Sequence, residues 1–169
     1  IRDRVRNVTV RDDVNWIVYE LKGMLNRGTD IVVTTGGLGP TYDDVKLEAV
    51  ALATEKKLII NQEALEMVKR RYEEYARSGY FHDASMSPTR IKMATIPEGA
   101  IPLENFAGAA PGVLLTKDKT DIICLPGVPA EIRSIIENSL QDYLKKKFGH
   151  SAFKEKEIVV HWKDESTLA

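Results

Sequence analysis

The stretch Asp30-Ile-Val-Val-Thr-Thr-Gly-Gly-Leu-Gly-Pro-Thr-Tyr-Asp-Asp44 decides the fold of this chain. Its first part is a short, β-branched and almost continuously apolar run, which is typical of a strand buried on both faces of a parallel sheet. Glycines then interrupt the strand, and a helical pattern begins at Asp43. A strand, a glycine-rich loop and a helix in this order indicate an α/β protein whose loop lies at the carboxyl end of a strand.

The segments on either side repeat this alternation. Val5 to Val10 has the composition of a short strand, and the apolar positions after Asp12 recur at spacings of three and four. Such spacing predicts an amphipathic helix that Asp12 caps. Further along, a buried strand over 121–125 leads into a helix over 130–148. The whole pattern predicts a three-layer α/β fold with a mostly parallel, mixed sheet.

Composition restricts the classes of function. The chain has 169 residues and a formal net charge of −1, which gives no general electrostatic reason to bind nucleic acid or an anionic membrane. No apolar run approaches the roughly 18 residues that a membrane-spanning helix needs. The single cysteine, Cys124, excludes an internal disulfide and suits a reducing compartment. We therefore expect a cytoplasmic domain without a membrane or nucleic-acid partner.

The glycine loop predicts an anion site. Gly36, Gly37 and Gly39 let the backbone N–H groups after Thr35 approach an anion closely, up to the turn at Pro40. The dipole of the following helix favours negative charge at the same place. The spacing matches neither a Walker loop nor the dinucleotide-binding fingerprint. A tight turn without a ligand is the alternative interpretation.

Three carboxylates are predicted to lie beside this loop. Asp43 and Asp44 would compete with a phosphate for the positive end of the helix, unless a divalent cation bridges them to it. Mg²⁺ suits such a bridge, because it commonly binds one or two carboxylates together with substrate oxygens. Asp12 follows the preceding predicted strand, which places it on the same rim of a parallel sheet. Ordinary helix capping is the alternative for each of the three.

Two further loops are candidates for ligand contact. The small-residue segment from Asn105 to Gly112, which includes Gly108 and Pro111, could wall a flat ring or a nucleotide. Its alternative is a simple connector. Pro126-Gly127 follows a buried strand, so its backbone amides are predicted to lie on the rim that carries the glycine loop. A rigid turn is the alternative there.

Four segments, taken together, carry a family resemblance: Thr34–Val45, Lys92–Ala100, Asn105–Gly112 and Leu125–Glu131. In this order, and over roughly residues 8 to 145, they resemble the molybdopterin-binding domain family of molybdenum-cofactor biosynthesis. Within that family the likeness is greatest to the amino-terminal domains of competence/damage-inducible (CinA) proteins and their archaeal relatives. The resemblance implies a molybdopterin-binding fold and a domain over residues 1–150, followed by the start of a further strand or carboxyl-terminal segment over 151–169.

The resemblance also implies a choice of functions. CinA-like domains hydrolyse ADP-ribose-type pyrophosphates with a divalent metal, Mg or Co. Other relatives bind molybdopterin or transfer adenylate to it, and a non-catalytic binding domain is the third possibility. In the cofactor-synthesis branch two aspartates are important, and they fall on Asp12 and Asp44 here. The resemblance also implies a homo-oligomer. This chain departs from the family at Lys46, where Thr is common, and at Ala109, and the family's first strand and helix are not found in this sequence.

Overall fold

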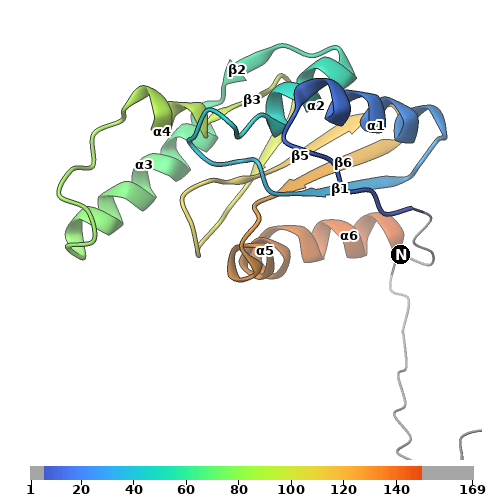
Figure 1. Cartoon of the computed structure of the whole chain (residues 1–169). Coiled ribbons are helices and arrows are strands. Elements are labelled where there is room, and N and C mark those ends of the chain that lie inside the picture. The colour runs from blue at the N-terminus through green and yellow to red at the C-terminus, as the bar shows by residue number, and fades with distance from the viewer. Residues whose placement is uncertain (1–5, 150–169) are drawn as a thin grey trace, which may run out of the picture.

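The computed structural model describes residues 6–149, which form a sheet with helices on both faces (Figure 1). Helices α1 (Val14–Asn26) and α2 (Lys46–Thr54) pack on one face and on each other. The opposite face is covered by a continuous helical segment, in which α5 (Pro129–Ile135) leads through the π-helical turn η1 (Ile136–Leu140) into α6 (Gln141–Phe148). The predicted three-layer α/β fold is confirmed.

The main sheet is mixed, as predicted. Its strand order is β1-β6-β5-β4, where β1 is Ile31–Thr35, β6 is Thr120–Leu125, β5 is Gly112–Lys117 and β4 is Ile101–Leu103. β1 runs parallel to β6, and the β6–β5 and β5–β4 pairs are antiparallel. Among the described strands the parallel pairing is thus confined to β1 and β6, which lead into two of the three predicted ligand loops, the glycine loop and Pro126-Gly127.

The position of β1 differs from the sequence expectation. Every residue of β6 is buried, as its composition predicted. β1 instead lies at the edge of the sheet, where Val32 is 4% exposed and its neighbour Val33 is 52% exposed. The expectation that this strand is buried on both faces was therefore wrong for one face. Val32 packs in the core with α1 and α2, whereas the opposite face is poorly covered at Val33.

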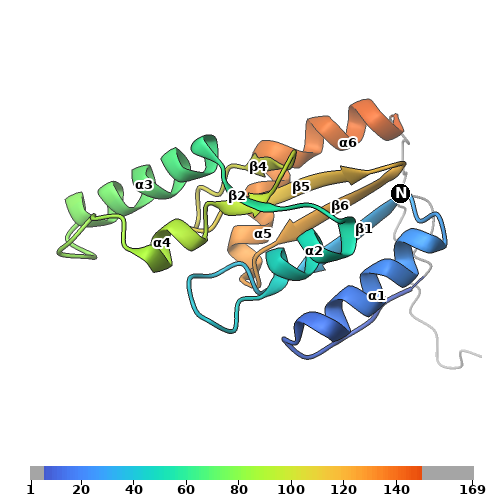
Figure 2. The same ribbon diagram turned by 90° about the horizontal axis from the view of Figure 1, so that it is seen from above.

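A smaller unit extends from one end of the sheet (Figure 2). It contains the two-stranded antiparallel pair of β2 (Leu58–Ile60) and β3 (Thr95–Pro97), with helices α3 (Gln62–Arg77) and α4 (Pro88–Lys92). Asn61 caps α3 through a hydrogen bond from the Ala64 amide, and Ser87 caps α4 with proline at the first position. Asn61 and Ser87-Pro88 are residue types that favour the start of a helix.

Two expectations at the amino-terminal end were wrong. Residues 6–10 form no strand in the structure. Asp13, and not Asp12, caps α1, because its carboxylate accepts hydrogen bonds from the amides of Asn15 and Trp16. Residues 151–169, where a further segment was predicted, lie outside the described residues. No helix among residues 6–149 combines the length and the apolar character that crossing a membrane requires.

Candidate functional site

Three loops meet at one edge of the sheet. Because β1 and β6 are parallel and β5 is antiparallel to β6, the ends of β1 and β6 lie beside the start of β5. The Gly36 amide donates to the Leu125 carbonyl at 3.0 Å, and a Cβ added to Gly127 would lie 3.6 Å from the Gly36 Cα. The glycine loop and the Pro126-Gly127 turn are therefore neighbours, as the sequence predicted.

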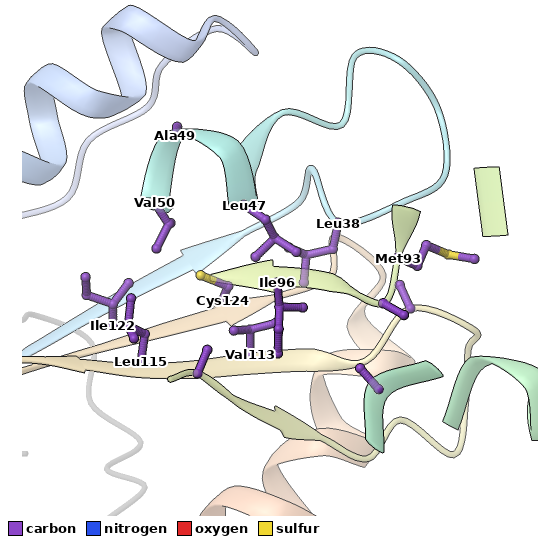
Figure 3. Packing of buried hydrophobic residues seen from close by; sticks show 14 of the residues in the cluster. Leu38, Leu47, Ala49, Val50, Met93, Ile96, Val113, Leu115, Ile122 and Cys124 are labelled. Carbon is purple, nitrogen blue, oxygen red and sulfur yellow. The ribbon is translucent and has the colours of Figure 1, made fainter. Parts of the chain in front are cut away.

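The glycine loop has a conformation that exposes backbone donors. Gly36 and Gly37 have φ angles of 81° and 70°, in the left-handed region that favours glycine. Leu38 is 4% exposed and points into the core beside Leu47, which anchors the loop (Figure 3). Among residues 6–149, no acceptor is found for the amides of Gly37, Leu38 and Gly39. These N–H groups are available to a ligand.

Asp44 closes the loop in a way that the sequence did not reveal. Its Oδ2 accepts hydrogen bonds from the amide and hydroxyl of Thr41, at 2.9 Å and 2.5 Å. The carboxylate packs over Gly39, since a Cβ added there would lie 2.6 Å from Oδ2. Helix α2 begins only at Lys46, with Val45 in the capping position and no side-chain cap. The capping interpretation of Asp43 and Asp44 was thus wrong, and Asp44 shapes the turn before the helix.

A cavity of about 130 Å³ lies against this turn. The residues that line it are Gly37, Leu38, Gly39, Tyr42, Asp44, Val45, Leu47, Glu48, Leu58, Lys92 and Thr95. The Lys92 ammonium donates to the Thr41 carbonyl, so a positive charge stands at its wall. A larger hollow of about 350 Å³ lies on the outer face of α5 and η1 and contains none of the predicted site residues. The smaller cavity is therefore the candidate site.

Asp12 lies at the same end of the sheet as the glycine loop, but it does not join Asp43 and Asp44 in one cluster as expected. It is exposed and stands just before α1, whose first turn lies at the same end of the sheet as the glycine loop (Figure 2). Within residues 6–149, no group of three or more carboxylate, histidine or cysteine side chains is placed to hold a metal ion. Asp12, Asp43 and Asp44 consequently do not form a three-carboxylate centre. A cation at this edge would have Asp44, with Asp43, as its protein ligands.

The loop from Asn105 to Gly112 is held by internal contacts. The buried Asn105 amide group donates to the Ala110 carbonyl and to Glu131 Oε2, each at 2.8 Å. Its Oδ1 accepts from the Ala107 amide at 3.1 Å. Gly108 packs so closely against Glu131 that an added Cβ would lie 2.3 Å from Oε2. The structure gives Asn105 and Gly108 a role in shaping the rim, and their predicted contact with ligand stays a prediction.

The other predicted rim residues are also placed by this packing. Pro111, Gly112 and Pro126 are buried, whereas Gly127 is exposed. A Cβ added to Gly112 would lie 3.2 Å from a methyl carbon of Ile135 and 3.3 Å from the Cys124 carbonyl oxygen. Gly112 therefore allows the start of β5 to approach α5 and β6. Of this group, only Gly127 presents its backbone to solvent beside the glycine loop.

Sequence reasoning missed two charged residues at this edge. Glu131 joins α5 to the Asn105 loop, and its acidic side chain gave no sign of that partner. Lys46 is buried, at 9% exposure, and its ammonium donates to the Thr35 carbonyl at 3.2 Å. The only signal for Lys46 was its departure from the threonine common in the family. Cys124 is a core side chain: burial raises the pKa of its thiol to about 11, so the thiol stays neutral.

The fold and this edge define a class: a three-layer α/β domain with a glycine-rich strand-to-helix loop at the carboxyl edge of its parallel strands, where such sheets bind ligands. A family model described as a probable molybdopterin binding domain matches residues 3–146. The chain belongs to this molybdopterin-binding domain family, as its motifs predicted.

Individual proteins support the same assignment. A curated protein of Pyrococcus furiosus is 40% identical over 164 residues, which cover 97% of this chain and 64% of that protein. A protein of Pyrobaculum aerophilum is 41% identical over 164 residues, covering 97% of this chain and 59% of its own length. The crystal structure of CinA from Thermoplasma acidophilum, a protein described as of unknown function, is 35% identical with a TM-score of 0.66. That match covers 78% of this chain and 72% of the CinA chain. The chain thus spans about three fifths of the two curated relatives.

Proposed function

We propose that this domain binds the phosphorylated part of a nucleotide or pterin at the glycine loop and hydrolyses an ADP-ribose-type pyrophosphate with a divalent metal. One observation carries the proposal: the free amides of Gly37 to Gly39 and the Asp44 carboxylate meet at one small cavity, with Lys92 at its wall. Amides and an ammonium attract a phosphoryl oxygen. A carboxylate beside them attracts the cation that commonly accompanies a phosphate.

The donor set fits Mg²⁺ or Co²⁺ arriving with the substrate. Asp44 Oδ2 is engaged by Thr41, and its second oxygen, together with Asp43, is the proposed metal ligand. Two protein carboxylates plus substrate oxygens are a common arrangement for Mg²⁺. A metal held there would polarise a phosphoryl oxygen and activate water. Asp12, at the same end of the sheet, is proposed as the second aspartate of the reaction.

The chain's own groups have defined tasks in this reaction. The glycine-loop amides bind and orient the diphosphate, and Lys92 adds positive charge at the wall. Water attacks one phosphorus, a new P–O bond forms, and the bridging P–O bond breaks to give AMP and ribose 5-phosphate. The cavity of about 130 Å³ is too small for a whole nucleotide. We propose that the remaining ligand extends over the rim made by the Asn105 to Gly112 loop and Pro126-Gly127.

Molybdopterin binding, or adenylyl transfer to molybdopterin, is the second candidate. The match to a probable molybdopterin binding domain favours it. The same amides would hold the pterin's terminal phosphate, and the Asn105 to Gly112 loop would wall its flat ring. In this case the bound metal and Asp44 would assist the transfer of an adenylyl group to molybdopterin and not its hydrolysis by water. The predicted homo-oligomer is compatible with both candidates and is checked by light scattering on the purified protein.

AMP formation, pterin binding and thermal unfolding together distinguish the two candidates. The protein is incubated with ADP-ribose and Mg²⁺ or Co²⁺, and AMP is measured for the wild type and for Asp44→Asn. AMP formation that is lost in the variant supports hydrolysis. Tight pterin binding without AMP supports the second candidate. If neither a nucleotide nor a pterin changes the thermal unfolding of the wild-type protein, both are wrong.

A further inference from the structure

We infer that Lys46 supplies a fixed positive charge for the anion at the glycine loop, so that the site takes a phosphate or pyrophosphate group even without a metal. This inference rests on the function proposed above and deepens it. Anion binding and metal binding are then assigned to different residues, because the carboxylates of the loop can bind a metal but repel an anion. Lys46 would bind the anion, whereas the free oxygen of Asp44 would bind the metal.

The environment of Lys46 is unfavourable for an ammonium without a ligand. The side chain is 9% exposed, and the Thr35 carbonyl is the acceptor that the structure gives it. None of the ion pairs within residues 6–149 includes Lys46. An ammonium has three donors, and burying it without a counter-charge is costly. Lys46 is also the first residue of α2, where the helix dipole disfavours a cation.

An anion at the glycine loop would offset both costs, because Lys46 lies directly against that loop. The Lys46 amide donates to the Gly37 carbonyl at 3.3 Å. A Cβ added to Gly37 would lie 3.1 Å from Lys46 Cβ and 3.4 Å from Lys46 Cε. The ammonium is one bond beyond Cε and donates to the Thr35 carbonyl, so the charge stands beside Gly37, the first of the three residues with free amides. The positive groups therefore come from the loop backbone and Lys46 together.

Thr34, near the end of β1, is a second polar side chain that is poorly satisfied near the loop. The Thr34 hydroxyl is buried, and its one polar neighbour of note is the weakly hydrogen-bonding Cys124 thiol, whose burial-raised pKa it lowers; it meets no stronger partner within the described part of the chain. Thr34 precedes Thr35, whose carbonyl the Lys46 ammonium holds, and both Thr34 and Lys46 influence the pKa of Cys124. Two buried polar groups with unused hydrogen-bonding capacity thus lie beneath the loop. Buried polar groups in proteins are normally satisfied, which points to a polar ligand at this edge.

The test is the binding of inorganic pyrophosphate in the presence of EDTA, without a metal. Titration calorimetry measures the affinity, and the melting temperature reports stabilisation by the ligand. Lys46→Met keeps the aliphatic side chain and removes the charge. Lys69→Met, on the exposed face of α3, removes one charge away from the loop and is the matched control. We expect pyrophosphate affinity to fall at least about tenfold in Lys46→Met and to be unchanged in Lys69→Met. Without pyrophosphate, Lys46→Met should melt at the same temperature as the wild type or higher, because an unpaired buried charge is gone.

A structural role for Lys46 predicts the opposite pair of results. If Lys46→Met melts at a lower temperature and binds pyrophosphate as well as the wild type, the inference is wrong. If wild-type protein binds pyrophosphate neither with nor without Mg²⁺, the proposed function fails together with it. Asp44→Asn distinguishes the Lys46 inference from the proposed hydrolysis, since this variant should lose AMP formation and keep metal-free pyrophosphate binding. Should Lys46→Met not fold, the side-chain NMR resonance of Lys46 in the wild type decides: it moves on addition of pyrophosphate, and an unmoved resonance overturns the inference.

Discussion

At the residue scale, the glycine loop is set by where side chains are missing as much as by where they are present. Gly36 is needed for its positive φ, and an added Cβ there meets no atom within 4 Å. Gly39 is needed for space, because an added Cβ would lie 2.6 Å from Asp44 Oδ2. Neighbouring glycines in one motif thus serve different physical purposes, and substitutions at them should have different effects.

Gly39→Ala should therefore move the Asp44 carboxylate away from Thr41 and lower metal-dependent AMP formation at least about tenfold. Gly36→Ala should instead lower the free energy of unfolding by about 1 kcal/mol, because alanine is strained at positive φ. Urea unfolding and the AMP assay on both variants check this contrast. Full activity in Gly39→Ala would show that the position of Asp44 is unimportant.

Asn105 gives a second prediction, about stability. Its side chain is 3% exposed and links the Ala110 carbonyl, the Ala107 amide and Glu131. Replacing it by alanine leaves buried polar groups unpaired, which should lower the free energy of unfolding by about 2 kcal/mol. Urea unfolding of Asn105→Ala measures the change. A loss of under about 0.5 kcal/mol would mean that solvent replaces these hydrogen bonds.

Sequence reasoning at this scale identified residue types better than their partners. It found the glycine loop and its acidic residues, but it assigned the cap of α1 to Asp12 and not to Asp13. Two adjacent aspartates have equal capping propensity, so only the backbone conformation decides between them. It also passed over Lys46, because a lysine at a helix start is usually solvated and its burial depends on tertiary packing.

At the element scale, the edge strand β1 shows where a local pattern is insufficient. Its β-branched sequence predicted two buried faces, but a strand's place in the sheet depends on pairing partners far away in the sequence. The same reason explains residues 6–10, which have strand-like composition and pair with nothing in the structure. The helices after Asp12 and over 130–148 were predicted well, because apolar periodicity is a local signal.

The edge position gives a matched pair of isosteric substitutions. Val32→Thr places a hydroxyl in the apolar core and should lower the free energy of unfolding by about 1–3 kcal/mol. Val33→Thr, at the next position, places the same hydroxyl at a side chain that is 52% exposed and should change stability by less than about 0.5 kcal/mol. Chemical denaturation of both proteins tests the assigned faces of β1. Equal losses would contradict the exposed position of Val33.

At the scale of the whole molecule, Asp121 holds the carboxyl-terminal helix against the sheet. Asp121 is fully buried at the start of β6 and accepts hydrogen bonds from Lys147 at 2.6 Å, Tyr143 at 2.7 Å and Thr116 at 2.9 Å. Burial by itself raises the pKa of this carboxyl, but its hydrogen bonds from Lys147, Tyr143 and Thr116 bring it below the ordinary value of 3.8. These contacts join α6 to the sheet at the strand end opposite the glycine loop.

The sign of the pH dependence follows from that lowered pKa. The folded state binds the Asp121 proton more weakly than the unfolded state, so the contribution is complete above pH 3.8 and is lost as pH falls toward the folded pKa. Asp121→Asn should be much less stable than the wild type at pH 7, and the difference should shrink below pH 3.8. Urea unfolding from pH 7 to pH 3 checks this. A difference that stays constant over this range would contradict the ionised state of Asp121.

Also at this scale, family membership was readable because four separated motifs occur in order along the chain, and the match over residues 3–146 confirms it. The convergence of their loops followed from the predicted strand-to-helix order. The hydrogen bonds within the Asn105 loop could not be predicted, since they depend on Glu131, which lies 26 positions away from Asn105. Topology could therefore be predicted, whereas the division between ligand-facing and structural residues required coordinates.

The most direct measurement is amide NMR of the wild-type protein during titration with pyrophosphate, first in EDTA and then with Mg²⁺. The amides of Gly37, Leu38 and Gly39 should shift strongly in both titrations, while that of Gly108, which is buried against Glu131, should move little. Asp44 resonances should respond further when Mg²⁺ is added. Saturating pyrophosphate that leaves the three loop amides unshifted would contradict an anion site at the glycine loop.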